Sequence, residues 1–247
     1  MRHLERMVRL AVEDEPAVVL LQELPVAALR QLEPWTGYQA FGAVAARPRL
    51  PAELAFGLTE RRPRLLRSML EGQANAILVA RRFGVRDHRE VVLNPRAFRR
   101  REIERLRLQF PAWFAWGWER RVVHAVRISR TDSETMLVAN LHATSYRPDK
   151  RIADAELLRA ATFADAVAEP GEPVVLGGDF NVTVVSSPTL RQLATAEWGF
   201  SPAGPGLDHV LVRGLAVAGP ETLWPPERRE HAGRLMSDHA PVDVTIT

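Results

Sequence analysis

Residues 173–184, PVVLGGDFNVTV, form the stretch around which the rest of the chain is interpreted. The apolar run at 174–176 is too short for a helix and rich in β-branched residues, so it predicts a buried strand. Two glycines follow, where the backbone can turn sharply or approach a ligand closely. Asp179 and Asn181 then face the same side if the extended conformation continues. Such a pair can hold a water molecule or a metal-bound oxyanion, although Gly, Asp and Asn are also common turn residues.

Composition limits the class of protein. With 247 residues, 46% of them hydrophobic, the chain is long enough for one domain over 1–247 with a full core. Lys150 is the only lysine, and a formal charge of +3 permits a polyanionic partner without requiring one. The absence of cysteine excludes disulfides, thiolate catalysis and thiolate zinc sites. No apolar run approaches the ~18 residues of a membrane span, and the first 16 residues are amphipathic rather than signal-like.

The N-terminal part predicts a helix, a buried strand and a second helix. Apolar residues at helical spacing indicate a helix over 3–13, and the continuous apolar run at 17–21 indicates a strand. That strand ends in Gln22 and Glu23, and Pro25 opens the second helix, to about Leu32. Glu23 is either a functional carboxylate or an ordinary surface charge at a strand end.

The middle of the chain combines strands with a basic and aromatic segment. Strands are expected over 75–82 and 90–94, and the basic run at 61–67 suggests a helix or loop. Six arginines occur within 96–107, and three tryptophans and a phenylalanine crowd into 113–118. Arginines beside exposed aromatics can hold flexible nucleic acid by phosphate contact and base stacking. The alternative is a helix followed by a hairpin that buries its tryptophans.

Chemically active side chains recur at the strand ends of the C-terminal half. Two strands, 122–129 and 135–146, are expected to be antiparallel neighbours joined by a turn at 130–133, and the second carries His142. A helix over 150–168 leads into the 174–176 strand, and a short helix is expected over 189–195. Asp208 stands at the mouth of a strand at 210–212, and Asp238 and His239 precede a final strand. Any one of these residues alone is more often structural; their repetition points to a site.

These motifs, taken together, resemble the endonuclease/exonuclease/phosphatase superfamily, to which deoxyribonuclease I belongs. The resemblance rests on QE at 22–23, the histidine of NLHATSY, GDFN at 178–181, LDHVLV from Asp208 and SDHAPV at 237–242. GQANAILVARR around Asn75 is also similar to a strand of that family. The likeness runs from about residue 12 to the C-terminus, and its most specific part is GDFN combined with SDH.

The resemblance implies an α/β (α+β) fold of four layers, with two mostly antiparallel sheets packed face to face between helices. It implies hydrolysis of a phosphoester with Mg²⁺ or Mn²⁺, and hard oxygen ligands suit such a cation. By this likeness Glu23 is the main metal ligand and Asp238 a second one.

The same resemblance assigns the remaining roles. Asp179 orients and deprotonates the attacking water, and Asn181 holds that water or a phosphate oxygen. His239, supported by Asp208, stabilises the pentacovalent transition state, and His142 contacts the phosphate or assists the leaving oxygen.

One departure from the family concerns the N-terminus. Members usually begin with a strand of the type TWN, whose Asn lies beside the metal, and nothing precedes the helix that starts here at about Leu4. We therefore expect either an upstream extension or a shortened member with a weakened metal site that is less stable and aggregates more readily. An extension could carry a signal or membrane anchor, whereas a true start at Met1 would fit a cytoplasmic protein.

The sequence leads to a nuclease-like phosphodiesterase that acts as a monomer on a phosphoester such as DNA or RNA, without an evident protein partner. A small-molecule or lipid phosphoesterase remains an alternative, as does a non-catalytic binding module on the same fold. The motifs encode the chemistry, while the loops that select the substrate match no particular subfamily.

Overall fold

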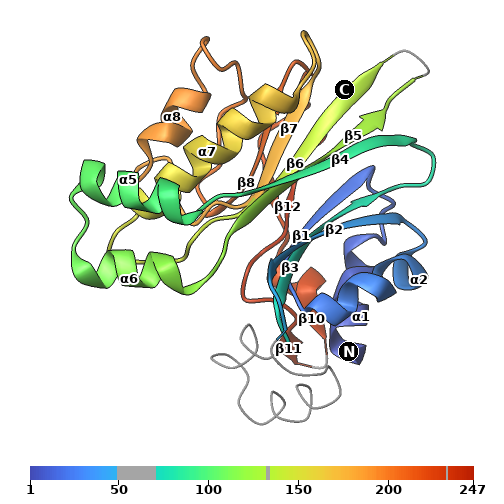
Figure 1. Ribbon diagram of the computed structural model, residues 1–247. Coiled ribbons are helices and arrows are strands. Elements are labelled where there is room, and N and C mark those ends of the chain that lie inside the picture. Colours follow the sequence, from blue (N-terminus) through green and yellow to red (C-terminus); the bar gives the residue numbers. More distant parts are fainter. Residues whose placement is uncertain (49–70, 132–133, 232) are drawn as a thin grey trace.

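Two β-sheets packed face to face form the centre of the computed structural model, which describes residues 1–48, 71–131, 134–231 and 233–247 (Figure 1). Helices cover the outer face of each sheet, which gives four layers. This arrangement confirms the expected fold class. The basic run at 61–67 lies outside the described residues.

The first sheet has three antiparallel strands in the order β1-β3-β2. These are β1 (Val18–Leu24), β2 (Gln39–Ala46) and β3 (Gln73–Val79). Every residue of β3 is buried, whereas β1, which pairs with β3 alone among the described strands, is mostly half-buried. β1 is therefore an edge strand of this sheet, and its outer backbone groups face away from the ladder.

The second sheet has five strands in the order β4-β5-β6-β7-β8. These are β4 (Val85–Val92), β5 (Val122–Ser129), β6 (Thr135–His142), β7 (Val174–Asp179) and β8 (Asp208–Arg213). β5 and β6 are antiparallel, as predicted. β6 and β7 are parallel because the helix α7 (Arg151–Val167) returns the chain to the starting end of the sheet.

Three apolar clusters hold these layers together. Between the sheets, Ile77 and Val79 of β3 pack among valines and isoleucines of β5 and β6. On the outside of the second sheet, Leu157 of α7 and Leu190 of α8 (Pro188–Leu193) belong to the largest cluster. On the outside of the first sheet, α1 (Arg2–Ala11) contributes Val8, next to α2 (Leu32–Thr36). Successive side chains along a strand point to opposite faces of its sheet. Each sheet therefore packs on one face against the cluster between the sheets and on the other against the cluster under its helices.

Helices α5 (Arg96–Leu106) and α6 (Phe110–Trp118) connect β4 to β5 and lie beside the N-terminal end of α7 (Figure 1). Trp116 is fully buried, but Trp113 and Trp118 are exposed. The expectation of a hairpin that buries its tryptophans is therefore wrong for this segment. A helix places only every third or fourth residue against the body, so the other tryptophans face outward.

Several boundaries differ from the prediction. The helix after Pro25 is divided into a 3-10 turn, η1 (Val26–Gln31), and α2. The strand expected over 90–94 begins earlier, at Val85, because β4 forms an antiparallel ladder along most of β5. The final strand shrinks to β12 (Val242–Asp243), which pairs with β9 (Thr222–Leu223).

Short elements complete the C-terminal region: η2 (Pro226–Arg229), β10 (Glu230–His231) and β11 (Arg234–Leu235). Val244 and Ile246, beyond β12, pack against the core between the sheets. Within the part of the chain that the structure describes, no helix is both long and apolar enough to cross a lipid bilayer.

Candidate functional site

One row of residues crosses the edge of the second sheet. His142 ends β6 and pairs in register with Asp179, which ends β7, and Asp179 pairs with Asp208, which begins β8. Residues that pair in register present their side chains on the same face of a sheet. The fold thus brings together three predicted site residues that are separated by 37 and 29 positions in the chain.

Close contacts surround the two glycines before Asp179, and they require glycine at position 178. A Cβ atom at Gly178, where φ is +130°, would lie 2.0 Å from the carbonyl oxygen of Leu141. A Cβ atom at Gly177 would lie 2.6 Å from a methyl group of Leu20 on the facing sheet. Only glycine therefore fits at 178, whereas a side chain at 177 would require Leu20 to move.

Asn181 reaches Asp179 through a turn rather than along an extended strand. Its φ of 54° is left-handed, so the extended conformation, under which the two side chains would face the same side, does not continue through Asn181. The backbone N–H of Asn181 donates to Asp179 Oδ1 at 2.9 Å, and its Nδ2 donates to Asp179 Oδ2 at 3.0 Å. A second bond from Nδ2 to the carbonyl of Ala143 fixes the amide. Asp179 is thereby held in a single orientation.

Glu23 comes from the opposite sheet. The ladder between β1 and β3 is irregular between Leu21 and Leu24, and Glu23 has a φ of 57°. A β-bulge of this kind redirects a side chain, and left-handed conformations of residues other than glycine are concentrated at functional sites. Glu23 Oε1 lies 3.8 Å from Nε2 of His142, with 69% of the side chain exposed. Its carboxylate therefore lies beside the row and open to solvent.

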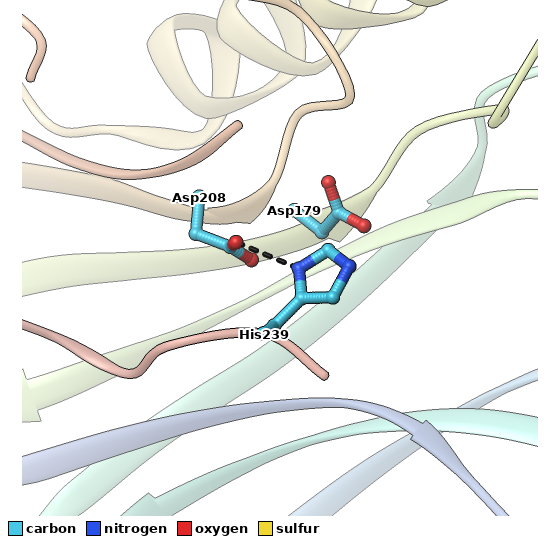
Figure 2. Close-up of side chains that lie close together, drawn as sticks. All are labelled: Asp179, Asp208 and His239. Carbon is cyan, nitrogen blue, oxygen red and sulfur yellow. Dashed lines mark hydrogen bonds and ion pairs between the residues drawn. The ribbon is translucent and has the colours of Figure 1, made fainter. Parts of the chain in front are cut away.

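His239 and Asp208 form a tight pair (Figure 2). His239 Nδ1 lies 2.7 Å from Asp208 Oδ2, and the imidazole ring lies beside Asp179. The hydrogen bond and charge of Asp208, together with the charges of Asp179 and Asp238, raise the pKa of His239 to about 9. At neutral pH the ring is therefore a cation that faces the site.

Asp179 is 8% exposed, and burial together with the charge of Asp208 raises its pKa to about 6. The charge of His239 and the hydrogen bond from Asn181 act in the opposite direction. A carboxylate with a pKa just below neutrality is ionised at pH 7 but still able to accept a proton during a reaction. This combination suits a general base.

His142 is fully buried and neutral, because burial and the charges of Arg121 and His239 hold its pKa well below the usual range. Nη1 of Arg121 lies 3.1 Å from Nδ1 of His142. The same Nη1 lies 3.3 Å from Nε2, but the carboxylates beside Nε2 favour the tautomer in which Nε2 carries the proton and the nearer nitrogen, Nδ1, accepts from Arg121. Nε2 faces Asp179 Oδ2 at 3.5 Å and Glu23 Oε1 at 3.8 Å. His142 thus presents an N–H donor to the space between the two carboxylates.

Sequence reasoning missed Arg121 and Lys150. Arg121 is 6% exposed and is held by Glu119, whose Oε2 accepts from Nη2 at 2.7 Å. An arginine at the start of a strand is expected on the surface, and no feature of the sequence marks this one as buried. Nζ of Lys150 donates to the carbonyl of Asn181 at 2.8 Å. The one feature of the sequence that could have pointed to Lys150 is that it is the only lysine among 33 lysines and arginines.

Glu156 supports the loop that follows His142. This fully buried carboxyl accepts from the backbone N–H of Thr144 at 2.6 Å and from Nε1 of Trp116 at 2.6 Å, and burial raises its pKa. The bonds join α7, α6 and the end of β6. They fix the backbone on which His142 and the turn at Asn181 depend.

The donor set fits a divalent cation. Carboxylate oxygens of Asp179 and Asp208 lie within 4.8 Å of each other and of the His239 ring, which would have to lose its proton to bind a metal, and Glu23 Oε1 lies 3.8 Å from Nε2 of His142. Carboxylate oxygens are the ligands that Mg²⁺ and Mn²⁺ prefer. Asp238 is exposed, and its charge helps to raise the pKa of His239. The assignment of the metal to Glu23 and Asp238 stays a prediction.

Comparison with known structures finds the same fold in several proteins. A functionally unknown conserved protein from Enterococcus faecalis gives a TM-score of 0.66 at 16% identity, over 99% of this chain and 90% of that one. A mannosyl-6-phosphatase from Bacteroides thetaiotaomicron gives 0.64 at 15%, over 100% and 91%. The human nocturnin catalytic domain with bound sulfate gives 0.63 at 16%, over 98% and 87%. At these identities the likeness shows the fold alone.

Comparison by sequence identifies the family as well as the fold. No curated protein matches the chain. The profile of the Endonuclease/Exonuclease/phosphatase family matches residues 1–239, a span that contains every residue of the site described above. Proteins of this family are phosphoester hydrolases and generally use a divalent metal. The chain belongs to the endonuclease/exonuclease/phosphatase family.

Proposed function

We propose that this protein hydrolyses phosphodiesters with the help of a divalent metal ion. The observation that carries the proposal is the row His142, Asp179 and Asp208, faced by the imidazolium of His239 and the open carboxylate of Glu23. Together these five residues offer a base, two donors and acidic oxygen ligands at one edge of the sandwich. A binding module would have no use for a base of raised pKa beside a cationic histidine.

Asp179 acts on the attacking water. Each of its oxygens accepts one hydrogen bond from Asn181, which leaves further lone pairs for a water molecule. Asp179 takes a proton from this water as its oxygen attacks phosphorus, and the bond from phosphorus to the leaving oxygen breaks. The leaving oxygen takes up a proton from solvent and Asp179 returns its proton to solvent, so that the diester and one water become a monoester and an alcohol.

The two histidines act on the phosphate. His239 donates from its free ring nitrogen to a non-bridging oxygen, where negative charge grows in the transition state. Asp208 keeps the ring charged and oriented through Nδ1. His142 donates from Nε2 to a phosphate oxygen or the leaving oxygen, and Arg121 holds it in this tautomer. A divalent cation held by Glu23 and Asp238 would polarise the phosphoryl oxygen.

The first test is an activity panel on the purified chain. We expect hydrolysis of bis-p-nitrophenyl phosphate in Mg²⁺ or Mn²⁺, abolished by EDTA and restored by added metal. The monoester p-nitrophenyl phosphate serves as the comparison, because a phosphatase would favour it. Faster turnover of the monoester, or activity that EDTA leaves unchanged, would contradict the proposal.

The pH profile tests the role of His239. The protonated ring is lost as pH rises through its pKa of about 9, so we expect the rate to fall on that alkaline side. In Asp208→Asn the main cause of the raised pKa is gone, and the alkaline limb should move to lower pH. The measurement is kcat/KM against pH for both proteins. An alkaline limb that stays in place would remove His239 from the mechanism.

The exposed arginines of α5 can contact the phosphates of a polymer, and single-stranded DNA is the first polymer to test. Arg100 and Arg101 are exposed, whereas Nη1 of Arg99 bonds to the carbonyl of Trp116. We expect the Arg100→Gln, Arg101→Gln variant to bind single-stranded DNA more weakly, with a shallower dependence on salt, and to keep its turnover of bis-p-nitrophenyl phosphate. Equal losses on both substrates would indicate a structural role for these arginines.

A further inference from the structure

The exposed face of α6 consists of aromatic side chains. Four large rings, which we call the aromatic ridge, stand 39% to 62% exposed: Phe110, Trp113, Phe114 and Trp118. The helix contains no charged residue. Large apolar side chains gathered on one exposed face usually mark a surface that binds something.

Helix α6 cannot rotate to bury the ridge, because its opposite face is already packed against the body of the protein. On the opposite face of α6, Ala112 and Trp116 are buried, and Trp116 is hydrogen-bonded to Glu156 of α7. The exposed rings contact one another: Phe110 and Trp113 meet edge to face at 4.7 Å between centroids, and Phe114 lies 5.8 Å from Trp118. The ridge is therefore a continuous apolar surface on a helix fixed to the body.

The ridge lies at the same end of the second sheet as the candidate site. β5 is antiparallel to β6, so β5 begins where β6 ends at His142. α6 directly precedes β5, and Trp118 is three residues from Arg121, which contacts His142. Figure 1 shows α5 and α6 side by side beyond this end of the sheet.

Arginines are concentrated on and just after α5, the helix that lies beside α6. Residues 96–107 contain six arginines and two glutamates, and five of these arginines are exposed: Arg96, Arg100, Arg101, Arg105 and Arg107. Aromatic rings that enter the interfacial layer, with cations beside them for anionic headgroups, are the features of surfaces that bind bilayers.

We propose that the aromatic ridge and the exposed arginines of the neighbouring segment 96–107 dock this protein on an anionic lipid bilayer. A nucleic acid fits less well, because base stacking needs free ring faces along a basic groove, and these rings contact one another on a helix surface. A second copy also fits less well, since a symmetric contact would bring two sets of arginines together.

Docking would bring the site to the headgroup layer, where phosphodiesters are abundant. This consequence, that the substrate is a lipid phosphodiester, rests on the proposed function. The docking proposal does not rest on the proposed function, because it depends only on the ridge and the arginines.

The experiment is sedimentation of the full chain with vesicles of phosphatidylcholine containing phosphatidylglycerol, and with vesicles of phosphatidylcholine alone. We expect binding to the anionic vesicles, with a loss of about tenfold or more in the variant Phe110→Ser, Phe114→Ser, Trp118→Ser. Val185→Ser is the matched control, because Val185 is a 91% exposed apolar residue outside the ridge. Arg96→Gln, Arg100→Gln should weaken binding mainly to the anionic vesicles.

Three results would overturn the proposal: no vesicle binding by the natural chain, equal binding by the ridge variant, or equal loss in the Val185 control. Loss of single-stranded DNA binding in the ridge variant without vesicle binding would assign the ridge to nucleic acid. A natural chain that is dimeric by gel filtration, a monomeric ridge variant and no vesicle binding would assign it to a second copy. Turnover of bis-p-nitrophenyl phosphate is measured in parallel, so failure of the proposed chemistry is distinguished from failure of docking.

Discussion

Replacing Asp179 with Asn is expected to lower turnover by roughly 100-fold or more while the fold is preserved. The amide has the shape of the carboxylate and can still accept from the backbone N–H of Asn181. It cannot take a proton from water, however, and the contribution of general-base catalysis is lost. The measurement is the initial rate on bis-p-nitrophenyl phosphate at saturating Mg²⁺, with the melting temperature as a check on folding.

Asp165→Asn provides the matched control. Asp165 lies on α7 and forms an exposed ion pair with Arg213, so its loss should change neither rate nor melting temperature appreciably. Near-normal activity of Asp179→Asn would eliminate the assigned base. If activity returned only at high Mn²⁺ concentration, Asp179 would be a metal ligand instead, together with Asp208 and His239.

The second large effect is expected for Glu23→Gln, which should raise the metal concentration required for activity by at least about tenfold. The change removes one of the two carboxylates, Glu23 and Asp238, proposed to hold the cation. Because 69% of the Glu23 side chain is exposed, the isosteric amide should not unfold the chain. Direct calorimetric titration with Mg²⁺ and Mn²⁺ gives the affinity without relying on catalysis.

Glu134→Gln is the control for the metal titration. Glu134 is an exposed residue immediately before β6, at the opposite end of that strand from His142. Its variant should titrate like the natural chain. An unchanged metal affinity in Glu23→Gln would place the ion elsewhere, with the Asp179, Asp208 and His239 cluster as the next location to test.

Much of the fold was accessible from the sequence because it depends on local signals. The apolar run before GDFN, the periodicity of α7 and the alternation of β5 and β6 predicted elements that the structure contains. Boundaries were less accurate where pairing extends a strand, as in β4, or where the chain ends in short bridges, as at β12. Strand length there depends on partners that are distant in sequence.

In the aromatic segment of α6, the sequence could not predict which side chains are exposed. Composition indicated arginines beside tryptophans, but which rings are exposed depends on how α6 rests on α7. Trp116 and Trp118 differ by two positions, a half-turn of a helix, and one is buried while the other is 61% exposed. The surface on which the docking proposal rests was therefore not visible in the sequence.

By itself the sequence determined which chemical groups the site has and that they follow buried strands, because apolar runs and the residues after them are local features. The tertiary structure alone decided how these groups meet. Strand register sets His142, Asp179 and Asp208 in one row, a bulge turns Glu23 toward it, and burial makes Arg121 a partner of His142. Register, strain and burial arise from contacts between segments far apart in the chain, and so do the pKa values of about 6 and about 9 at Asp179 and His239.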